Sequence, residues 1–76
     1  MPADLRKLPR AFGQTVRQLR LQAGLSQIEL AEKSDLNFNY VGSVERGEKL
    51  ASIDTVVRLA RGLGVSGSEL LRQAGY

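Results

Sequence analysis

The stretch GLSQIELAEKSDLNFNYVGSVERG, residues 24–47, decides the fold. Ser26 and Glu29 have the spacing of a capping box, in which each side chain binds a backbone amide at the start of a helix. That helix is short, and Asn37 is placed to cap a second helix, which ends at Gly47. The stretch therefore predicts two helices joined by a turn that is too short to be a linker.

Apolar side chains recur on one side of both helices, and this side belongs in the core. The expected inward residues are Leu30, Ala31, Leu36, Val41 and Val44. A turn this short sets two helices at a large angle, as in a helix-turn-helix that reads the major groove of DNA. The outer face of the second helix suits such readout, because Asn binds two edge atoms of adenine and Arg binds two of guanine. The residues on this face are Asn37, Phe38, Asn39, Gly42, Ser43 and Arg46.

Apolar periodicity and stop signals predict three more helices around this pair. The first runs from Pro9 to a stop at Gly24. The second follows a cap at Ser52, and the third follows another capping box at Ser66 and Glu69. The expected core stripes are Phe12, Val16, Leu19 and Ala23 in the first, Ile53, Val56, Leu59, Ala60 and Leu63 in the second, and Leu70 and Leu71 in the third.

No segment alternates apolar and polar residues for long enough to predict a strand. We therefore expect an all-α fold, a compact five-helix domain with a helix-turn-helix over residues 9–76. Residues 1–8 are expected to form an N-terminal arm. Gly13 is the weak point of the first helix, since glycine lowers helix stability.

The composition argues against an enzyme. The 76 residues include no His and no Cys, which removes the commonest general base and the thiolate metal ligands. We expect no catalytic site, metal site or cofactor, and no small-molecule ligand is evident. The formal net charge of +3 suits an anionic partner such as double-stranded DNA. No apolar run approaches the ~18 residues of a membrane span, so we expect no membrane contact and a cytoplasmic location.

Four segments of the chain together resemble the Cro/repressor-type helix-turn-helix family, also called xenobiotic-response-element-like. They are VRQLR at residues 16–20, GLSQIELAEKS at 24–34, VERG at 44–47 and LARGLGV at 59–65. The resemblance covers about residues 9–72 and implies a repressor-like fold that binds DNA. Residues 36–47 are similar to the controller proteins of restriction–modification systems, although antitoxin-type and phage regulators share much of the pattern.

The resemblance also implies roles for individual residues. Gln27 matches a position that contacts the DNA backbone. Phe38, Asn39 and Ser43 match positions that read bases, although Phe is unusual for that task. Arg20 and Glu45 match a pair that forms a partly buried salt bridge between the first and third helices. Asp35 stands where the family usually has Gly, and Asp tolerates the left-handed conformation better than most residues.

The remaining site residues follow from their chemistry, and each has a structural alternative. Asn37 is a candidate base reader that is equally explained as a helix cap. Tyr40, Arg46 and Lys49 are candidate contacts to the DNA backbone; the alternatives are a half-buried ring and solvated charges. A dimer interface is expected at Leu71 and Tyr76, and the alternative for Leu71 is a core position.

These features predict a sequence-specific transcriptional regulator that binds a pseudo-palindromic operator as a homodimer. The helix at about residues 37–46 would lie in the major groove, and the dimer contacts must come from outside the helix-turn-helix. The rival hypothesis is a protein-interaction module with the same fold, such as an antitoxin-like subunit or a bridging factor. Exposed apolar side chains at Ile28 and Phe38 would support the rival.

Overall fold

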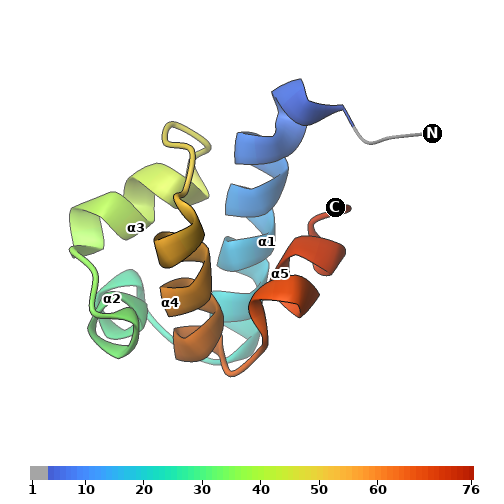
Figure 1. The fold of residues 1–76 in the computed structure, drawn as a ribbon. Coiled ribbons are helices and arrows are strands. Elements are labelled where there is room, and N and C mark those ends of the chain that lie inside the picture. The colour runs from blue at the N-terminus through green and yellow to red at the C-terminus, as the bar shows by residue number, and fades with distance from the viewer. Residues whose placement is uncertain (1–3) are drawn as a thin grey trace.

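The computed structural model describes residues 4–76, which fold into five α-helices and one 3-10 helix (Figure 1). In chain order these are η1 (Leu5–Lys7), α1 (Leu8–Gln22), α2 (Gln27–Ser34), α3 (Phe38–Glu45), α4 (Ile53–Leu63) and α5 (Gly67–Gln73). The described residues form no strand, so the expected all-α fold is confirmed. None of the helices in this range is long and apolar enough to cross a membrane.

Side-chain caps fix where four of the helices begin. Ser26 Oγ accepts the amide of Glu29 at 3.0 Å, and the Glu29 carboxylate accepts the amide of Ser26 at 2.8 Å. This capping box holds the pKa of Glu29 below its ordinary value, chiefly because the Ser26 amide donates to the ionised carboxylate. The side chains of Asn37, Ser52 and Ser66 accept a backbone amide in the first turn of α3, α4 and α5, respectively.

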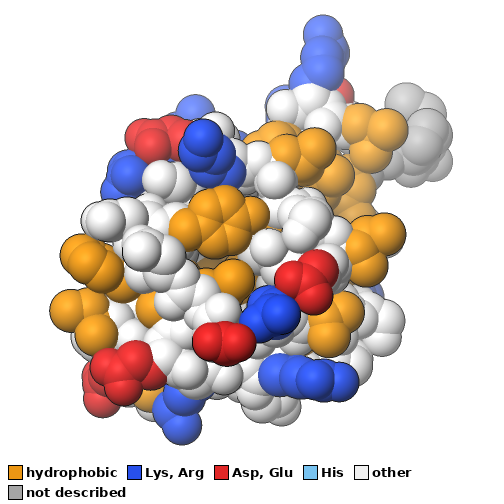
Figure 2. Space-filling model, turned by 60° about the vertical axis from the view of Figure 1, so that its left-hand side comes forward, with side chains coloured by type: hydrophobic (Ala, Val, Ile, Leu, Met, Phe, Trp, Pro, Cys, Tyr) orange, Lys and Arg blue, Asp and Glu red, His pale blue; other side chains and the backbone are white. Residues whose placement is uncertain are grey.

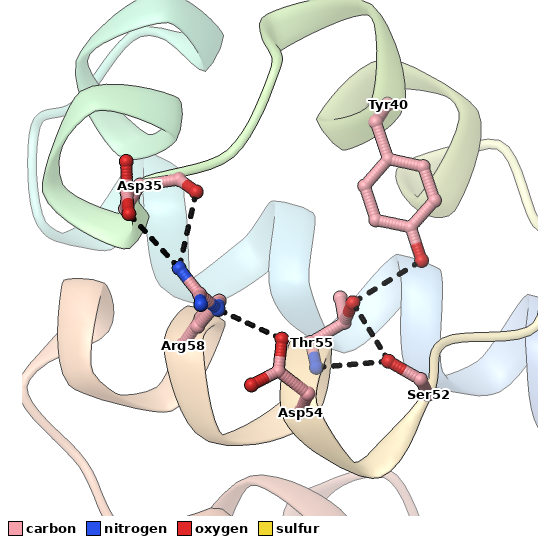
Figure 3. A network of polar contacts seen from close by, with 6 residues as sticks. All are labelled: Asp35, Tyr40, Ser52, Asp54, Thr55 and Arg58. Atoms are coloured by element: carbon pink, nitrogen blue, oxygen red, sulfur yellow. Dashed lines mark hydrogen bonds and ion pairs between the residues drawn. The ribbon is translucent and has the colours of Figure 1, made fainter.

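The turn between α2 and α3 depends on Asp35, whose backbone lies in the left-handed region at φ 54° and ψ 48°. The amide of Leu36 donates to the carbonyl of Ala31 at 2.9 Å and closes the end of α2. Arg58 of α4 then braces the turn from outside, because its Nη1 lies 3.0 Å from the Asp35 carboxylate (Figure 3). Arg58 Nε is held in place by Asp54 at 2.8 Å.

The helix-turn-helix packs on the pair α1 and α4, which run side by side between it and α5 (Figure 1). Helix α2 packs mainly on α4, and α3 packs mainly on α1. The core consists of Phe12, Val16, Leu30, Ala31, Val41, Val44, Leu59, Ala60 and Leu70. Four of the five inward residues expected in the motif are therefore buried, and Leu36 is partly buried against them.

Two expected core residues are exposed, and both lie at helix ends. Ile53 is the first residue of α4 and is 86% exposed, so the prediction that it faces the core is wrong. Ala23 is the C-cap of α1 and is also exposed. Periodicity therefore selects the wrong residues at these helix ends; in the first turn of α4 the buried side chain is Thr55 and not Ile53.

Gly13 has the opposite role from the one expected. It is buried at the crossing of α1 and α3, where a Cβ would lie 2.1 Å from the carbonyl oxygen of Val44 and 2.8 Å from that of Glu45. Backbone atoms cannot yield as a flexible side chain can. The glycine therefore lets α3 approach α1 closely, and the close approach offsets its poor helix propensity.

The expected arm at residues 1–8 differs from the structure in its second half. Leu5–Lys7 form η1, capped by Asp4, and α1 begins at Leu8 rather than at Pro9. The C-terminal residue Tyr76 ties this segment down, because its hydroxyl donates to the carbonyl of Asp4. Residues 1–3 of the expected arm lie outside the described part of the chain.

Candidate nucleic-acid interface

The outer face of α3 carries most of the candidate base readers. Phe38 is 47% exposed, Asn39 is exposed and Ser43 is half-buried. Ser43 Oγ donates to the carbonyl of Asn39 at 3.1 Å. Asn37 Oδ1 accepts the amide of Asn39 at 2.8 Å, so the cap uses one of the two lone pairs of this oxygen and fixes the direction of the side chain.

Gly42 lies in the middle of α3 and is buried, although the sequence places it on the exposed outer face. A Cβ at this position would lie 3.0 Å from Nη1 of Arg46 and 3.5 Å from Oε1 of Gln27. Two side chains from different elements therefore cover the glycine, one from the end of α3 and one from the start of α2. A molecule that approaches this face meets the polar groups of Arg46 and Gln27 before it reaches the backbone of Gly42.

Arg46 is an exposed C-cap residue whose guanidinium is already paired. Its Nε donates to Glu48 Oε2 at 2.9 Å and its Nη2 donates to Glu48 Oε1 at 3.1 Å. Nη2 also lies 3.4 Å from Ser43 Oγ. The pair holds the pKa of Glu48 below its ordinary value, mainly through the hydrogen bonds from Arg46.

Glu45 is buried behind the interface and links three elements. Its carboxylate accepts Arg20 Nε at 2.6 Å, Arg20 Nη2 at 3.0 Å and Gln27 Nε2 at 3.1 Å. The side chains of Arg20 and Glu45 are 9% and 2% exposed. Arg20 Nη1 also donates to the carbonyl of Leu25 at 2.9 Å, and the hydrogen bonds that Arg20 donates to Glu45 raise the pKa of Arg20 above its ordinary value. The pair of Arg20 and Glu45 orients α3 against α1, and the hydrogen bond from Gln27 to Glu45 sets the direction of the Gln27 side chain.

Tyr40 is half-buried and leans toward the start of α4. Its hydroxyl lies 3.3 Å from Thr55 Oγ1, and Ser52 Oγ donates to the same Thr55 oxygen at 3.1 Å (Figure 3). Because Thr55 Oγ1 accepts a hydrogen bond from Ser52, the Thr55 hydroxyl can donate its own hydrogen bond to the hydroxyl oxygen of Tyr40. The proton of Tyr40 is then free for a partner outside the protein.

The charge on this side of the molecule is mixed. Figure 2 brings forward the side that carries α2 and α3, and it shows Lys and Arg side chains interleaved with Asp and Glu around a centre of hydrophobic and uncharged polar side chains. Lys49, in the loop after α3, is exposed. Contacts from this face must therefore depend on individual side chains more than on a broad basic field.

Comparison with known proteins decides the family. The sequence pattern of the family described as Helix-turn-helix matches residues 16–70, which include α2, α3, α4 and the second half of α1. The chain belongs to the helix-turn-helix family. The control protein C.BamHI of Bacillus amyloliquefaciens is 41% identical over 61 residues, covering 79% of this chain and 75% of that protein. The control protein C.SmaI of Serratia marcescens is 42% identical over 64 residues, covering 84% and 76%.

Solved structures of helix-turn-helix proteins agree with this placement. The restriction-modification controller protein C.AhdI of Aeromonas hydrophila is 44% identical, with a TM-score of 0.78 over 80% of this chain and 92% of that chain. The clp gene regulator ClgR of C. glutamicum is 31% identical, with a TM-score of 0.83 over 99% of this chain and 92% of that chain. The expected repressor-like helix-turn-helix fold is thereby confirmed.

The residues expected at a dimer interface of this helix-turn-helix protein lie far from α3 in sequence, on α5 and at the C-terminus. Leu71 is half-buried and lines a shallow apolar pocket, while Tyr76 is 39% exposed. The other residues of the pocket are Leu8, Pro9, Phe12, Leu50, Ala51 and Val56. Leu50 is itself 69% exposed, so apolar surface continues from the pocket to the outside.

Two residues at the interface were missed by the sequence reading. The sequence predicts Gly42 only as one residue on the outer face of the second motif helix, and Glu48 only as part of the loop that follows. The sequence signal for Glu48 is limited to its backbone, because the amide of the residue after a helix-ending glycine is bound by the helix end whatever its side chain. Its partner Arg46 could not be inferred, since the pair depends on how the side chain folds back over Gly42.

Proposed function

We propose that this helix-turn-helix protein is a transcriptional regulator that binds a pseudo-palindromic operator in double-stranded DNA as a homodimer, with α3 in the major groove. The observation that carries the proposal is the outer face of α3, where Asn39, Ser43 and Arg46 present polar groups and the Arg46 guanidinium lies over the buried Gly42. The relatives named as controller proteins favour a role in regulating restriction–modification genes. Such a regulator acts in the cytoplasm, and we propose no catalytic role for it.

Base readout falls mainly to Asn39. Its exposed side chain can offer both an oxygen and an amide to adenine, whereas the helix cap uses one lone pair of the Asn37 oxygen and fixes the direction of that side chain. Asn37 can still donate a single hydrogen bond. Phe38 can contact a thymine methyl group, and Ser43 can bond several bases. Readout therefore combines one bidentate contact with three weaker ones.

Contacts to the DNA backbone come from the rim of this face. Gln27 lies at the first position of α2, where free backbone amides and the helix dipole favour a phosphate. Only one amide proton of Gln27 is needed by Glu45, so the other can reach the phosphate. Tyr40 can donate its remaining proton, and Arg46 and Lys49 supply positive charge.

A dimer is needed because one such motif reads few bases. A two-fold dimer presents two recognition helices to major grooves about 34 Å apart. The apolar pocket lined by Leu71, with Tyr76 on the same C-terminal segment, supports an interface away from α3. This placement leaves both copies of α3 free for DNA.

The proposal is tested by selecting bound sequences from a random duplex pool. A palindromic consensus with half-sites one helical turn apart is expected, and binding to random duplex should weaken as salt rises. Asn39→Ala should cost about 1–3 kcal/mol on the selected site and relax one position of the consensus. Gln14→Ala, on the exposed side of α1, is the matched control and should change neither.

The rival protein-interaction module makes the opposite prediction. Ile28 and Phe38, which are 53% and 47% exposed, are its support. Absence of salt-dependent binding to any duplex at micromolar protein would overturn DNA binding and favour the rival. An unchanged consensus for Asn39→Ala would remove Asn39 from the base readers and leave DNA binding intact.

A further inference from the structure

Glu48 is an acid fixed beside the centre of the proposed DNA-binding face. Its amide donates to the carbonyl of Ser43 at 3.0 Å, and the amide of Gly47 donates to that of Val44 at 3.0 Å. These two bonds, with Gly47 at φ +75°, form the Schellman motif that ends α3. The backbone of Glu48 is thereby set by the helix end.

The position is unfavourable for an acid unless the carboxylate has a partner. The C-terminus of a helix carries partial negative charge, which repels an anion, and DNA phosphates would repel it again. Arg46 supplies the compensation, because two of its N–H groups bind the two oxygens of Glu48 side by side. A guanidinium uses the same forked arrangement to bind guanine or a phosphate.

We propose that Glu48 is a specificity-determining residue. Its carboxylate binds the Arg46 guanidinium, and Arg46 leaves the carboxylate only when a guanine or an equally well-placed DNA group binds the guanidinium instead. This inference rests on the proposed DNA binding of α3, and it gives Arg46 a guanine contact on the operator in place of the backbone contact assigned to it above. On random DNA, a phosphate reaching Arg46 must displace Glu48 and then face its free carboxylate. On the operator, a bidentate base contact offsets that loss. Glu48 therefore lowers non-specific affinity more than specific affinity.

The pair is suited to such exchange because it is exposed. The side chains of Arg46 and Glu48 are 58% and 55% exposed, and exposed ion pairs are weak enough to be broken by a competing ligand. The guanidinium already lies over Gly42, so release changes its partner with little movement of the chain. By contrast, the buried pair of Arg20 and Glu45 cannot exchange in this way.

The test is Glu48→Gln, with Kd measured by fluorescence anisotropy on the selected operator and on a scrambled duplex of the same length. At about 0.1 M salt, one added phosphate contact should tighten scrambled-duplex binding roughly five- to ten-fold and steepen the salt slope by about 0.9. Operator affinity should change less, so the ratio of specific to non-specific affinity falls.

A double-mutant cycle separates this role from a general charge effect. In the Arg46→Ala background, Glu48→Gln should leave the ratio of affinities unchanged, because no guanidinium remains to be released. Glu69→Gln breaks a similar exposed pair with Arg72 on α5 and is the matched control, which should change neither duplex. Circular dichroism melting should show that all variants fold.

Three results would overturn the inference: equal tightening on both duplexes, tightening that persists in the Arg46→Ala background, or weaker operator binding by Glu48→Gln. The last would mean that Glu48 holds Arg46 ready for DNA and does not restrain it. If the unmodified protein shows no salt-dependent binding to either duplex, the proposed function itself fails. Binding without a change in the ratio overturns the role of Glu48 alone.

Discussion

Removal of the buried carboxylate at Glu45 should be severely destabilising. Glu45→Ala leaves Arg20, whose side chain is 9% exposed, with the carbonyl of Leu25 as its remaining protein partner. It also takes the acceptor from Gln27 Nε2. Breaking a buried pair by deleting one partner costs about 3–5 kcal/mol, because the remaining charge stays buried without compensation.

The magnitude matters because the domain is small. At ~0.05–0.15 kcal/mol per residue, 76 residues give a total stability of roughly 4–11 kcal/mol. Glu45→Ala should therefore remove a large share of it. Urea unfolding followed by far-ultraviolet circular dichroism at neutral pH measures the free energy of unfolding directly, and an unchanged m-value would show that the same surface is exposed.

Two further variants distinguish the buried charge from the loss of atoms. Replacing both partners, Arg20→Met with Glu45→Leu, should restore much of the stability, since a buried pair often equals its apolar substitutes. Glu69→Ala, which breaks the exposed pair with Arg72, should change the urea midpoint far less. The reasoning is refuted if Glu45→Ala costs no more than Glu69→Ala, or if the double variant is no more stable than Glu45→Ala.

Three other predictions follow from the same structure. Gly13→Ala should lower the melting temperature, because overpacking against the α3 backbone costs about 1–3 kcal/mol and outweighs the gain in helix propensity; an unchanged melting temperature would contradict the close approach. Gly42→Ala should keep the fold but weaken operator binding, because its Cβ would displace the Arg46 guanidinium; unchanged anisotropy titrations would contradict this. Lys49→Ala should weaken binding to all duplexes and flatten the salt slope by about one; an unchanged slope would remove it from the phosphate contacts.

The helix-turn-helix could be predicted from the sequence because its signals are local. The capping box at Ser26 and Glu29, the cap at Asn37 and the stop at Gly47 each depend on residues within one turn of each other. The left-handed turn at Asp35 follows from the chemistry of a single side chain. Local rules of this kind need no knowledge of which helices pack together.

The errors came from tertiary contacts. Gly13 was judged by helix propensity alone, although the backbone of α3 lies against it. Periodicity places Ile53 in the core, although the side chain of the first turn of α4 that is buried against the neighbouring helices is Thr55. The hydrogen bond between Tyr40 and Thr55 could not be foreseen either, because the Thr55 oxygen comes from another helix, although the prediction that Tyr40 contacts the DNA backbone still stands as a prediction. In each case the partner lies far away in sequence, so spacing within one helix could not reveal it.

The contacts that orient α3 differ from the residues proposed to read DNA. Glu45 with Arg20, Gly13 with the α3 backbone, and Tyr40 with Thr55 hold the helix from its inner side and its ends. Asn39 lies on the outer face, where its side chain is exposed. Because the side chain of Asn39 takes no part in the first set, a change at Asn39 can alter the preferred operator at little cost in stability, whereas a change at Glu45 loses the helix position on which every operator depends.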